Sequence, residues 1–407
     1  MRHMHERLQA RHLHPSRKRA HDAAMADARS RRRAKTDERL PLPDEVALVL
    51  QGGGALGAYQ AGVIEGLEEK GIEVDWVAGI SIGAVNAAIF AGNPPERRVA
   101  KLRGFWEKVT GALPALPFAG GGDEWREFVH MASAGLVAMQ GVPGFFSPRL
   151  LTPALAPAKS MGALSFYDNA PLVATLNDHV DWALLNDGPV RLSVGAVNVE
   201  TGNFHYFDTR GKDRTRIDAR HVMASGALPP GLPPVEIDGA WWWDGGIVSN
   251  TPLSHVLEHQ KADLLVFQVD LFSARGDRPA TIMDVYSREK DIRFSSRTRQ
   301  VTDQLIRLRK EREAIRKVLD KLPGALKQDE DVARLAALAA EHAVSVVHLI
   351  YRKHGWEGGA RDFEFSRATM EHHWTEGLAA ITETMRHDSL LAKNIVDGKT
   401  AAFDLVS

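Results

Sequence analysis

A serine flanked by glycines two residues away on each side is the first candidate for chemistry in this chain. The segment Gly79-Ile80-Ser81-Ile82-Gly83 follows an apolar stretch at 74–80 and precedes a small-residue stretch at 82–91. These stretches predict a strand and a helix. A serine at such a turn has an exposed hydroxyl, because its glycine neighbours carry no Cβ to crowd it. We expect Ser81 to be a nucleophile; the alternative is a serine in an ordinary tight turn.

A glycine-rich loop precedes the serine motif. The segment Gly52-Gly53-Gly54-Ala55-Leu56-Gly57 lies between a predicted buried strand at 46–50 and a predicted helix at 58–70. Bare backbone N–H groups in such a loop bind an anion, either a phosphate or the oxyanion of acyl transfer. The spacing also fits the dinucleotide fingerprint, with Glu73 and Asp75 near the distance for a ribose ligand. However, the second strand ends in the serine motif, so the two motifs together favour the oxyanion.

An aspartate is the candidate base. The segment Trp243-Asp244-Gly245-Gly246 ends a predicted hairpin whose turn is Asp238-Gly239. The three tryptophans at 241–243 could form a dry wall that raises the carboxyl pKa above its usual value of about 3.9. On composition alone, an ordinary Asp-Gly-Gly turn is the stronger interpretation. A Ser-His-acid triad would instead use one of three histidines, His205, His221 or His255.

Composition excludes several function classes. Among the 407 residues, 51 are Lys or Arg and 52 are Asp or Glu, so no overall charge indicates a nucleic-acid partner. The sequence contains no cysteine, which excludes disulfides, thiolate catalysis and Cys-ligated zinc in this chain. No apolar run reaches 18 residues, and the first 40 residues lack the apolar core of a secretory signal. We therefore expect a cytoplasmic protein without a transmembrane helix or signal peptide.

The pattern of elements predicts an α/β fold. Strand, helix, strand and helix alternate from 46 to 91, as in a parallel sheet with helices on its faces. Residues 113–161, rich in Gly, Pro and Ala, indicate an insertion or lid with short helices. We divide the chain into a basic arm at 1–42, a main domain at 43–280 and an α-rich C-terminal extension at 281–407. In the extension we expect helices at 304–322, 329–342 and 366–385, and a strand at 344–351.

The basic arm has two interpretations. Residues 1–42 are rich in Arg, His and Lys, with cationic clusters at 17–19 and 31–33. Such a segment is a solvated, poorly ordered tail, or it contributes peripheral contact with an anionic membrane surface. The acidic residues in the same stretch dilute its charge.

Four sequence blocks together resemble the patatin-like phospholipase family. They are the glycine loop, the serine motif, the Asp-Gly-Gly segment and Ala224-Ser225-Gly226-Ala227-Leu228-Pro229, which is similar to the family's Ala-Ser-x-x-x-Pro block. The order and spacing of the blocks match over residues 45–270. The C-terminal part, including 362–367, resembles an uncharacterised extension found on some bacterial members.

The resemblance implies a three-layer α/β/α fold with a mostly parallel central sheet. It also implies a Ser–Asp dyad, with Ser81 as nucleophile and Asp244 as proton acceptor, and it implies neither a metal nor another cofactor. The implied oxyanion hole consists of backbone N–H groups of Gly52, Gly53, Gly54 and Ala55, and the motifs are completed by Gly57, Gly79, Gly83, Gly245 and Gly246. Leu56 departs from the family, because many members carry Arg or Lys at this position.

The expected activity is that of a serine acyl hydrolase. The resemblance implies cleavage of lipid carboxylic esters through an acyl-enzyme, as in a lipase, phospholipase A or lysophospholipase. Two alternatives stay open. The chain could hydrolyse another ester, such as an intracellular polyester or a short acyl ester, or it could be a non-catalytic interaction protein with the same fold.

Overall fold

The computed structural model describes residues 40–111, 122–339 and 342–405. Residues 42–407 form one compact unit, separate from residues 1–41. The predicted basic arm lies outside the described residues up to residue 39, so its two interpretations stay open. Within the described residues, we find no helix with the length and apolarity needed to cross a membrane.

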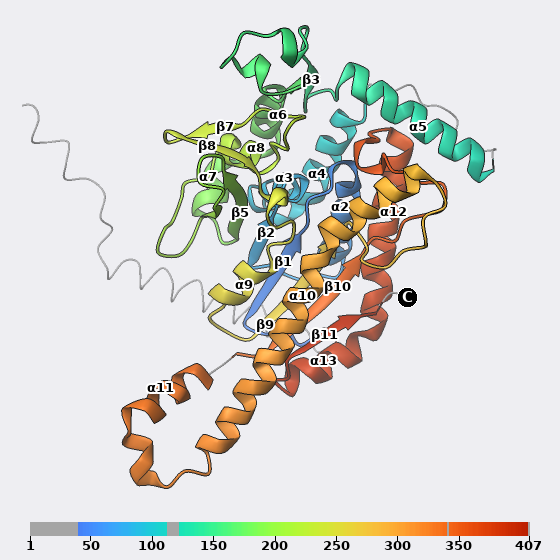
Figure 1. The fold of residues 1–407 in the computed structure, drawn as a ribbon. Coiled ribbons are helices and arrows are strands. Elements are labelled where there is room, and N and C mark those ends of the chain that lie inside the picture. The colour runs from blue at the N-terminus through green and yellow to red at the C-terminus, as the bar shows by residue number, and fades with distance from the viewer. Residues whose placement is uncertain (1–39, 112–121, 340–341, 406–407) are drawn as a thin grey trace, which may run out of the picture. The chain divides into compact units, whose positions relative to one another are not determined.

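A nine-stranded sheet forms the centre of the unit (Figure 1). Its strands are β1 (Glu45–Leu50), β2 (Trp76–Gly79), β5 (Arg191–Asn198), β6 (Phe204–Asp208), β7 (Val235–Ile237), β8 (Ala240–Asp244), β9 (Leu264–Asp270), β10 (Val344–Ile350) and β11 (Ala401–Asp404). The order is β11-β10-β9-β1-β2-β5-β8-β7, and β6 also pairs with β5. Neighbours from β11 to β5 pair in parallel, whereas β6, β7 and β8 pair antiparallel. Two short strands, β3 (Ser147–Pro148) and β4 (Tyr167–Asp168), pair separately.

Helices surround this sheet. The α-helices are α2 (Gly57–Glu69), α3 (Ile82–Ala91), α4 (Pro95–Val109), α5 (Asp123–Gln140), α6 (Pro171–His179), α7 (Trp182–Asp187), α8 (Ala219–Ser225), α9 (Leu253–His259), α10 (Ile282–Leu319), α11 (Glu330–Ala339), α12 (Arg367–Thr384) and α13 (Asp388–Val396). The 3₁₀ turns are η1 (Gly54–Leu56), η2 (Pro153–Leu155), η3 (Met161–Ala163), η4 (Gly245–Ile247), η5 (Gly324–Gln328), η6 (Arg361–Phe363) and η7 (Met385–His387).

The sheet is covered on both faces. In β1, every residue from Val46 to Leu50 is buried, as expected for a central parallel strand rather than an edge strand. On one face, Leu253 and Val256 of α9 pack in the same apolar cluster as the β1 residue Val49. Helix α3 packs on β1, β2 and β5, and α12 packs on α2. The predicted three-layer α/β/α fold with a mostly parallel sheet is therefore confirmed.

The C-terminal segment supplies part of this same sheet. β10 pairs with β9 over its full length, and β11 pairs with β10. Helix α12 lies so close to α2 that a side chain at Gly62 would collide with the backbone carbonyl of Trp374. The predicted boundary at residue 280 stays a prediction.

Two elements differ from the sequence-based expectation. The lid expected at 113–161 contains one long helix, α5, rather than only short ones. The buried face of this helix carries the polar His130 and Ser133 beside buried apolar residues such as Val137, while the large apolar Trp125 and Phe128 are exposed. Helix α10 begins at Ile282, after a capping box formed by Thr281 and Asp284, and therefore starts well before the predicted residue 304.

Candidate active site

Ser81 lies at a sharp turn between β2 and α3. Its backbone has φ 55° and ψ −123°, a conformation that is strained for a residue other than glycine. The flanking glycines are required by close packing. A side chain at Gly79 would collide with the Gly83 carbonyl, and one at Gly83 would collide with the Leu50 carbonyl. This is the geometry that a nucleophile elbow needs.

Ser225, at the end of α8, supports this turn. Its hydroxyl accepts a hydrogen bond from the Ser81 N–H (2.9 Å) and donates one to the Gly195 carbonyl (2.7 Å). Ser225 is fully buried. Two residues further along, the Ala227 carbonyl accepts the N–H of Asp244 at 3.1 Å. The segment that begins at Ala224 therefore fixes the backbones of both Ser81 and Asp244.

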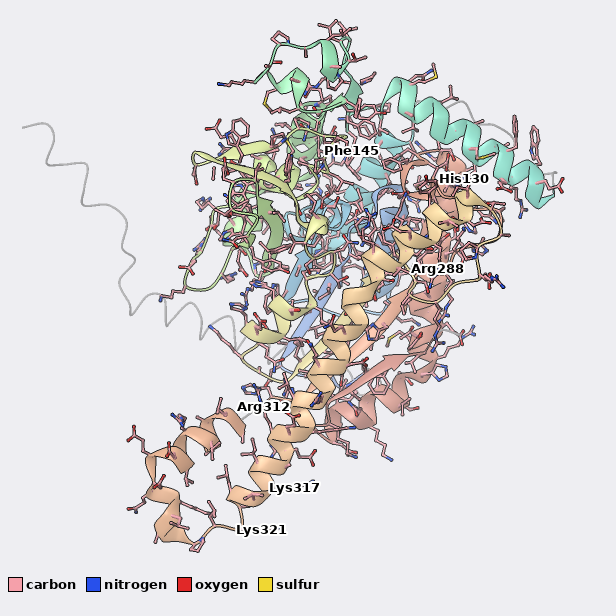
Figure 2. The ribbon with its side chains drawn as sticks, viewed as in Figure 1. His130, Phe145, Arg288, Arg312, Lys317 and Lys321 are labelled. Carbon is pink, nitrogen blue, oxygen red and sulfur yellow. The ribbon has the colours of Figure 1, made fainter. Side chains whose placement is uncertain are left out.

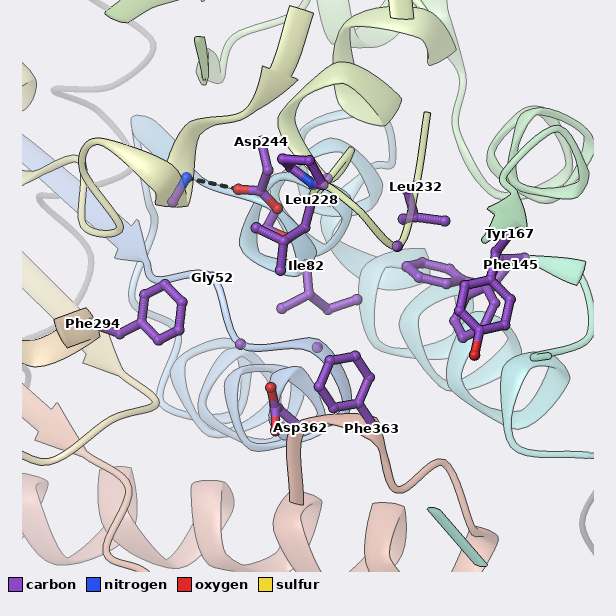
Figure 3. A pocket seen from close by; sticks show the side chains of 18 of the residues that line it. Gly52, Ile82, Phe145, Tyr167, Leu228, Leu232, Asp244, Phe294, Asp362 and Phe363 are labelled. Atoms are coloured by element: carbon purple, nitrogen blue, oxygen red, sulfur yellow. Dashed lines mark hydrogen bonds between the residues drawn. The ribbon is translucent and has the colours of Figure 1, made fainter. Parts of the chain in front are cut away.

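Asp244 lies at the end of β8, beside Ser81. Its side chain accepts the Ser81 hydroxyl and the Gly246 N–H, the latter at 2.7 Å (Figure 3). Burial raises the pKa of Asp244 to about 7, although both hydrogen bonds oppose this shift. The carboxylate is therefore placed and tuned to accept a proton near neutral pH.

The expected tryptophan wall is not present at the cavity. None of residues 241–243 lines it, and the Trp242 ring packs on Phe207 with centroids 5.1 Å apart. Asp244 is desolvated instead by its own burial, with 2% of its surface exposed. The hairpin strand β8 presents the carboxylate to the site but directs the preceding aromatic rings elsewhere.

The glycine loop passes next to Ser81. The Gly52 N–H donates to the Asn250 carbonyl (3.3 Å), and the Asn250 amide donates back to the Gly52 carbonyl (2.9 Å). The N–H groups of Gly53 and Gly54 have no hydrogen-bond partner among the described residues, and both glycines line the cavity. Gly54 adopts φ 56°, which glycine tolerates best.

Other predicted residues have different positions. Ala55 and Gly57 are buried and do not line the cavity, and Gly57 packs against Ile82. Gly245 lies against the Gly195 carbonyl, with too little space for a side chain. Ile82 follows the nucleophile candidate and lines the cavity. Its N–H is not hydrogen-bonded within the described part of the chain, so it is a further donor at the position that elbow hydrolases use.

A cavity of about 280 Å³ opens above these groups (Figure 3). Most of its lining is apolar, including Ile82, Val137, Phe145, Phe146, Leu228, Leu232, Phe272, Phe294, Phe363 and Phe365. No histidine occurs among its described lining residues. His255 instead contacts Asp208 at 3.1 Å, and His221 contacts Asp218 at 2.9 Å. His205 packs beside Phe207, away from the cavity. The structure therefore brings Ser81 and Asp244 together without a histidine.

Family profiles match two parts of the chain. The profile described as "Patatin-like phospholipase" matches residues 48–257, more than half of the sequence. The chain belongs to the patatin-like phospholipase family. A second profile, described as "Patatin phospholipase", matches residues 292–395 of this patatin-like chain.

Several named proteins are similar to this patatin-like chain. Lysophospholipase NTE1 of Phaeosphaeria nodorum is 26% identical over 245 residues, which cover 60% of this chain and 13% of that protein. The chain thus spans about an eighth of the length of this curated relative. Among solved structures, VipD from Legionella pneumophila is 16% identical, with 89% of this chain and 72% of that chain covered and a TM-score of 0.39. Human GIVD cytosolic phospholipase A2 is 13% identical, with 63% and 47% covered and a TM-score of 0.36.

Sequence reasoning missed the part of the patatin-like site that comes from the C-terminal segment. Phe294 of α10 and residues 362, 363 and 365 around η6 line the cavity together with the glycine loop. The Asp362 carbonyl lies directly against Gly54. Asn250, which holds Gly52, was also missed. The sequence signal for this part of the site was the block at 362–367. Its apolar and acidic residues form no catalytic motif, so the sequence did not indicate that they line the cavity.

Proposed function

We propose that this protein is a lipid acyl hydrolase that uses Ser81 as nucleophile and Asp244 as base. The observation that carries the proposal is the buried Asp244 carboxylate, which accepts the Ser81 hydroxyl at the floor of an apolar cavity. A carboxylate with a pKa of about 7 can take the serine proton and return it within one catalytic cycle.

In the proposed reaction, Ser81 Oγ attacks the ester carbonyl carbon while its proton passes to Asp244. The N–H groups of Gly53, Gly54 and Ile82 stabilise the tetrahedral oxyanion. The intermediate collapses, the proton on Asp244 passes to the leaving alcohol, and an acyl-enzyme remains on Ser81. Asp244 then takes a proton from water, the resulting hydroxide attacks the acyl carbon, and the fatty acid leaves as the proton returns to Ser81.

The cavity fits an acyl chain better than a charged headgroup. Its aromatic wall buries apolar surface, which contributes roughly 25 cal/mol per Å². Leu56, which replaces the basic residue of many family members, is fully buried and supplies no cation to the cavity. The lysophospholipase name of the NTE1 relative supports a monoacyl phospholipid as substrate. A short or polymeric ester is the alternative substrate class.

The test combines covalent labelling with an ester panel. We expect a fluorophosphonate probe to label the wild type, and neither Ser81→Ala nor Asp244→Asn to turn over esters graded by chain length. Loss of an acting nucleophile or base costs several powers of ten in rate. His205→Ala is the matched control and should keep wild-type turnover, because His205 is exposed and remote from the cavity. Wild-type turnover by folded Ser81→Ala would refute the assignment.

A surface feature next to the cavity supports action at a lipid interface. Residues 142–167 contain two cationic residues, Lys159 and Arg149, of which Arg149 lies 3.8 Å from Asp168. They also expose large apolar side chains, namely Leu150, Leu151, Leu155, Met161, Leu164 and Phe166. The same segment lines the cavity through Phe145, Phe146 and Tyr167. We propose that this segment contacts an anionic bilayer and that the lipid substrate enters the cavity from there.

Vesicle sedimentation tests this contact. The double substitution Leu150→Asp with Leu155→Asp should reduce binding to anionic vesicles, while turnover of a soluble short-chain ester stays at the wild-type level. Deletion of residues 1–39 measures the contribution of the arm separately. Unchanged vesicle binding in the double variant would remove the 142–167 segment from the proposal.

A further inference from the structure

Three metal-binding side chains meet in the C-terminal part of the chain, outside the cavity. His354 lies in the loop after β10, and His372 and Glu376 lie one turn apart on α12. One ligand atom from each residue lies within 4.8 Å of the other two. His354 Nε2 is 3.9 Å from Glu376 Oε2. Two ligands of one tetrahedral zinc ion lie roughly 3.4 Å apart, given metal–ligand bonds of about 2.1 Å. The cluster therefore has the dimensions to enclose one ion after small side-chain movements.

The ring nitrogens in this cluster have unsatisfied lone pairs or protons. Nε2 of His354 and Nε2 of His372 are both buried, and neither has a hydrogen-bond partner in the described part of the chain. The 3.9 Å separation from Glu376 is too long for a hydrogen bond. Buried polar atoms are normally paired, and two such nitrogens beside one carboxylate are placed to share a partner. A metal ion supplies one partner for all three groups.

Neighbouring residues already hold the two imidazole rings. Trp356 stacks on His354 with centroids 5.8 Å apart and meets the edge of His372 at 5.3 Å. The backbone N–H of His354 donates to Glu357 Oε2 at 3.0 Å, which fixes the loop backbone next to the ring. Such supporting contacts orient metal ligands before the ion binds. The His354 and Glu376 side chains are 38% and 43% exposed, so an ion can enter from solvent.

We propose that His354, His372 and Glu376 bind a divalent transition-metal ion of the zinc type. Two neutral imidazoles and one carboxylate form a ligand set that Zn²⁺ accepts, with water in the fourth position. The ion would join the loop after β10 to helix α12. Between these two points the chain forms η6, whose Asp362 and Phe363 line the cavity. We expect the ion to stabilise the position of this segment of the cavity wall. This structural role does not depend on the catalytic proposal.

Zinc titration of the metal-free, untagged full chain tests the site. We expect His372→Gln and Glu376→Gln to bind one Zn²⁺ fewer than the wild type in isothermal titration calorimetry. Affinity at this site should fall by more than the 10–100-fold that loss of an outer-shell partner costs. The first 21 residues contain five histidines, which give all variants the same background binding.

Two matched control variants should keep zinc binding at this site. Glu371→Gln changes a carboxylate on the same helix that pairs with Arg103, and His387→Gln changes an exposed histidine. Zn²⁺ should raise the thermal unfolding midpoint of the wild type and both controls, but not that of the two ligand variants. Added Co²⁺ should give a visible absorption band that the ligand variants lack.

Circular dichroism before titration checks that each variant is folded. If a ligand variant is unfolded, chelator titration of the zinc-loaded wild type provides the decisive measurement, with a fall in its unfolding midpoint expected. Equal zinc stoichiometry in the wild type and in folded ligand variants would overturn the proposal. So would an unfolding midpoint of the wild type that neither Zn²⁺ nor the chelator changes.

Discussion

Asp244 combines two features that shift its pKa in opposite directions, because it is buried yet accepts hydrogen bonds from its neighbours. Burial disfavours the charged form and raises its pKa to about 7, against a usual value near 3.8. Hydrogen bonds from Gly246 and Ser81 favour the charged form and limit the shift. Under the proposed mechanism, the same carboxylate sets the pH dependence of catalysis and part of the pH dependence of folding stability.

In the proposed mechanism, the ionised form of Asp244 is the active one. We expect kcat/KM for a soluble ester to rise with pH and to level off above an inflection near 7, because protonated Asp244 cannot accept the Ser81 proton. A pH–rate profile of the wild type measures this, with His205→Ala as the control that keeps the same inflection. A profile that is flat between pH 5 and 8 would contradict the assigned base.

The free energy of unfolding depends on pH in the opposite direction to kcat/KM. The folded state holds its Asp244 proton up to pH of about 7, whereas the unfolded chain releases it near 3.8. This group therefore stabilises the fold at low pH, and that contribution is lost as pH rises towards and through 7. We expect Asp244→Asn to unfold at higher denaturant concentration than the wild type at pH 8, with the advantage shrinking as pH falls below 7 and vanishing below about 3.8. A lower midpoint for Asp244→Asn at pH 8 would argue against a costly buried charge.

At the scale of elements, Ser225 connects α8, β5 and the turn that carries Ser81. Removing its hydroxyl in Ser225→Ala leaves the Ser81 N–H and the Gly195 carbonyl unpaired in a buried site. We expect a loss of about 1–3 kcal/mol in the free energy of unfolding and a fall in kcat larger than any change in KM. Urea unfolding and steady-state kinetics measure the two effects.

Ser160→Ala is the matched control for Ser225→Ala, since the Ser160 hydroxyl only donates to the nearby Pro157 carbonyl in an exposed turn. It should change neither quantity. Wild-type kinetics in Ser225→Ala would show that the elbow keeps its strained conformation without this support.

Helix α5 is a second element whose contacts bear on the site. Its buried face carries His130, labelled in Figure 2, and Ser133. His130 Nε2 lies 3.9 Å from Glu364 Oε2. Ser133 donates a hydrogen bond to the same carboxylate. Glu364 follows η6 directly, so α5 packs against the segment that forms the cavity wall. Val137 and Ala138 of α5 then complete that wall.

At the scale of the whole molecule, the C-terminal segment is expected to be necessary for folding. Deleting residues 281–407 would expose the buried β9 along the edge now paired with β10. It would also uncover the α2 surface around Gly62 and Gly66, where α12 packs. An exposed, apolar strand edge promotes aggregation. We expect the 1–280 chain to be insoluble or unfolded, as measured by soluble yield and circular dichroism.

The truncation needs a control of similar kind. Deletion of residues 1–39 should leave the unfolding midpoint near that of the full chain, since residues 42–407 form a compact unit. The circular dichroism spectrum should still show a folded protein. A soluble, cooperatively folded 1–280 chain would show that the C-terminal segment only completes the cavity wall.

Local sequence patterns were sufficient to predict the fold class, the family and most elements around Ser81. The turns at 79–83 and 238–239 depend on glycine and on apolar strands next to them, which are short-range features. The pairing of Ser81 with Asp244 was predicted only through the family resemblance. The structure brings these side chains together, and their catalytic roles stay predictions for the variants above to test.

Tertiary structure alone decided which distant segments complete the site. Gly54 meets Asp362, and His354 meets His372 and Glu376, because β10 joins the sheet beside β9 and α12 packs on α2. Contacts between residues so far apart in the sequence produce no local periodic pattern from which they could be predicted. The length of helix α5 was underestimated for a related reason, since the buried polar residues His130 and Ser133 contact Glu364, a partner that is identified only by its position in space. Short-range backbone preferences thus determined the elbow, whereas long-range packing determined the cavity.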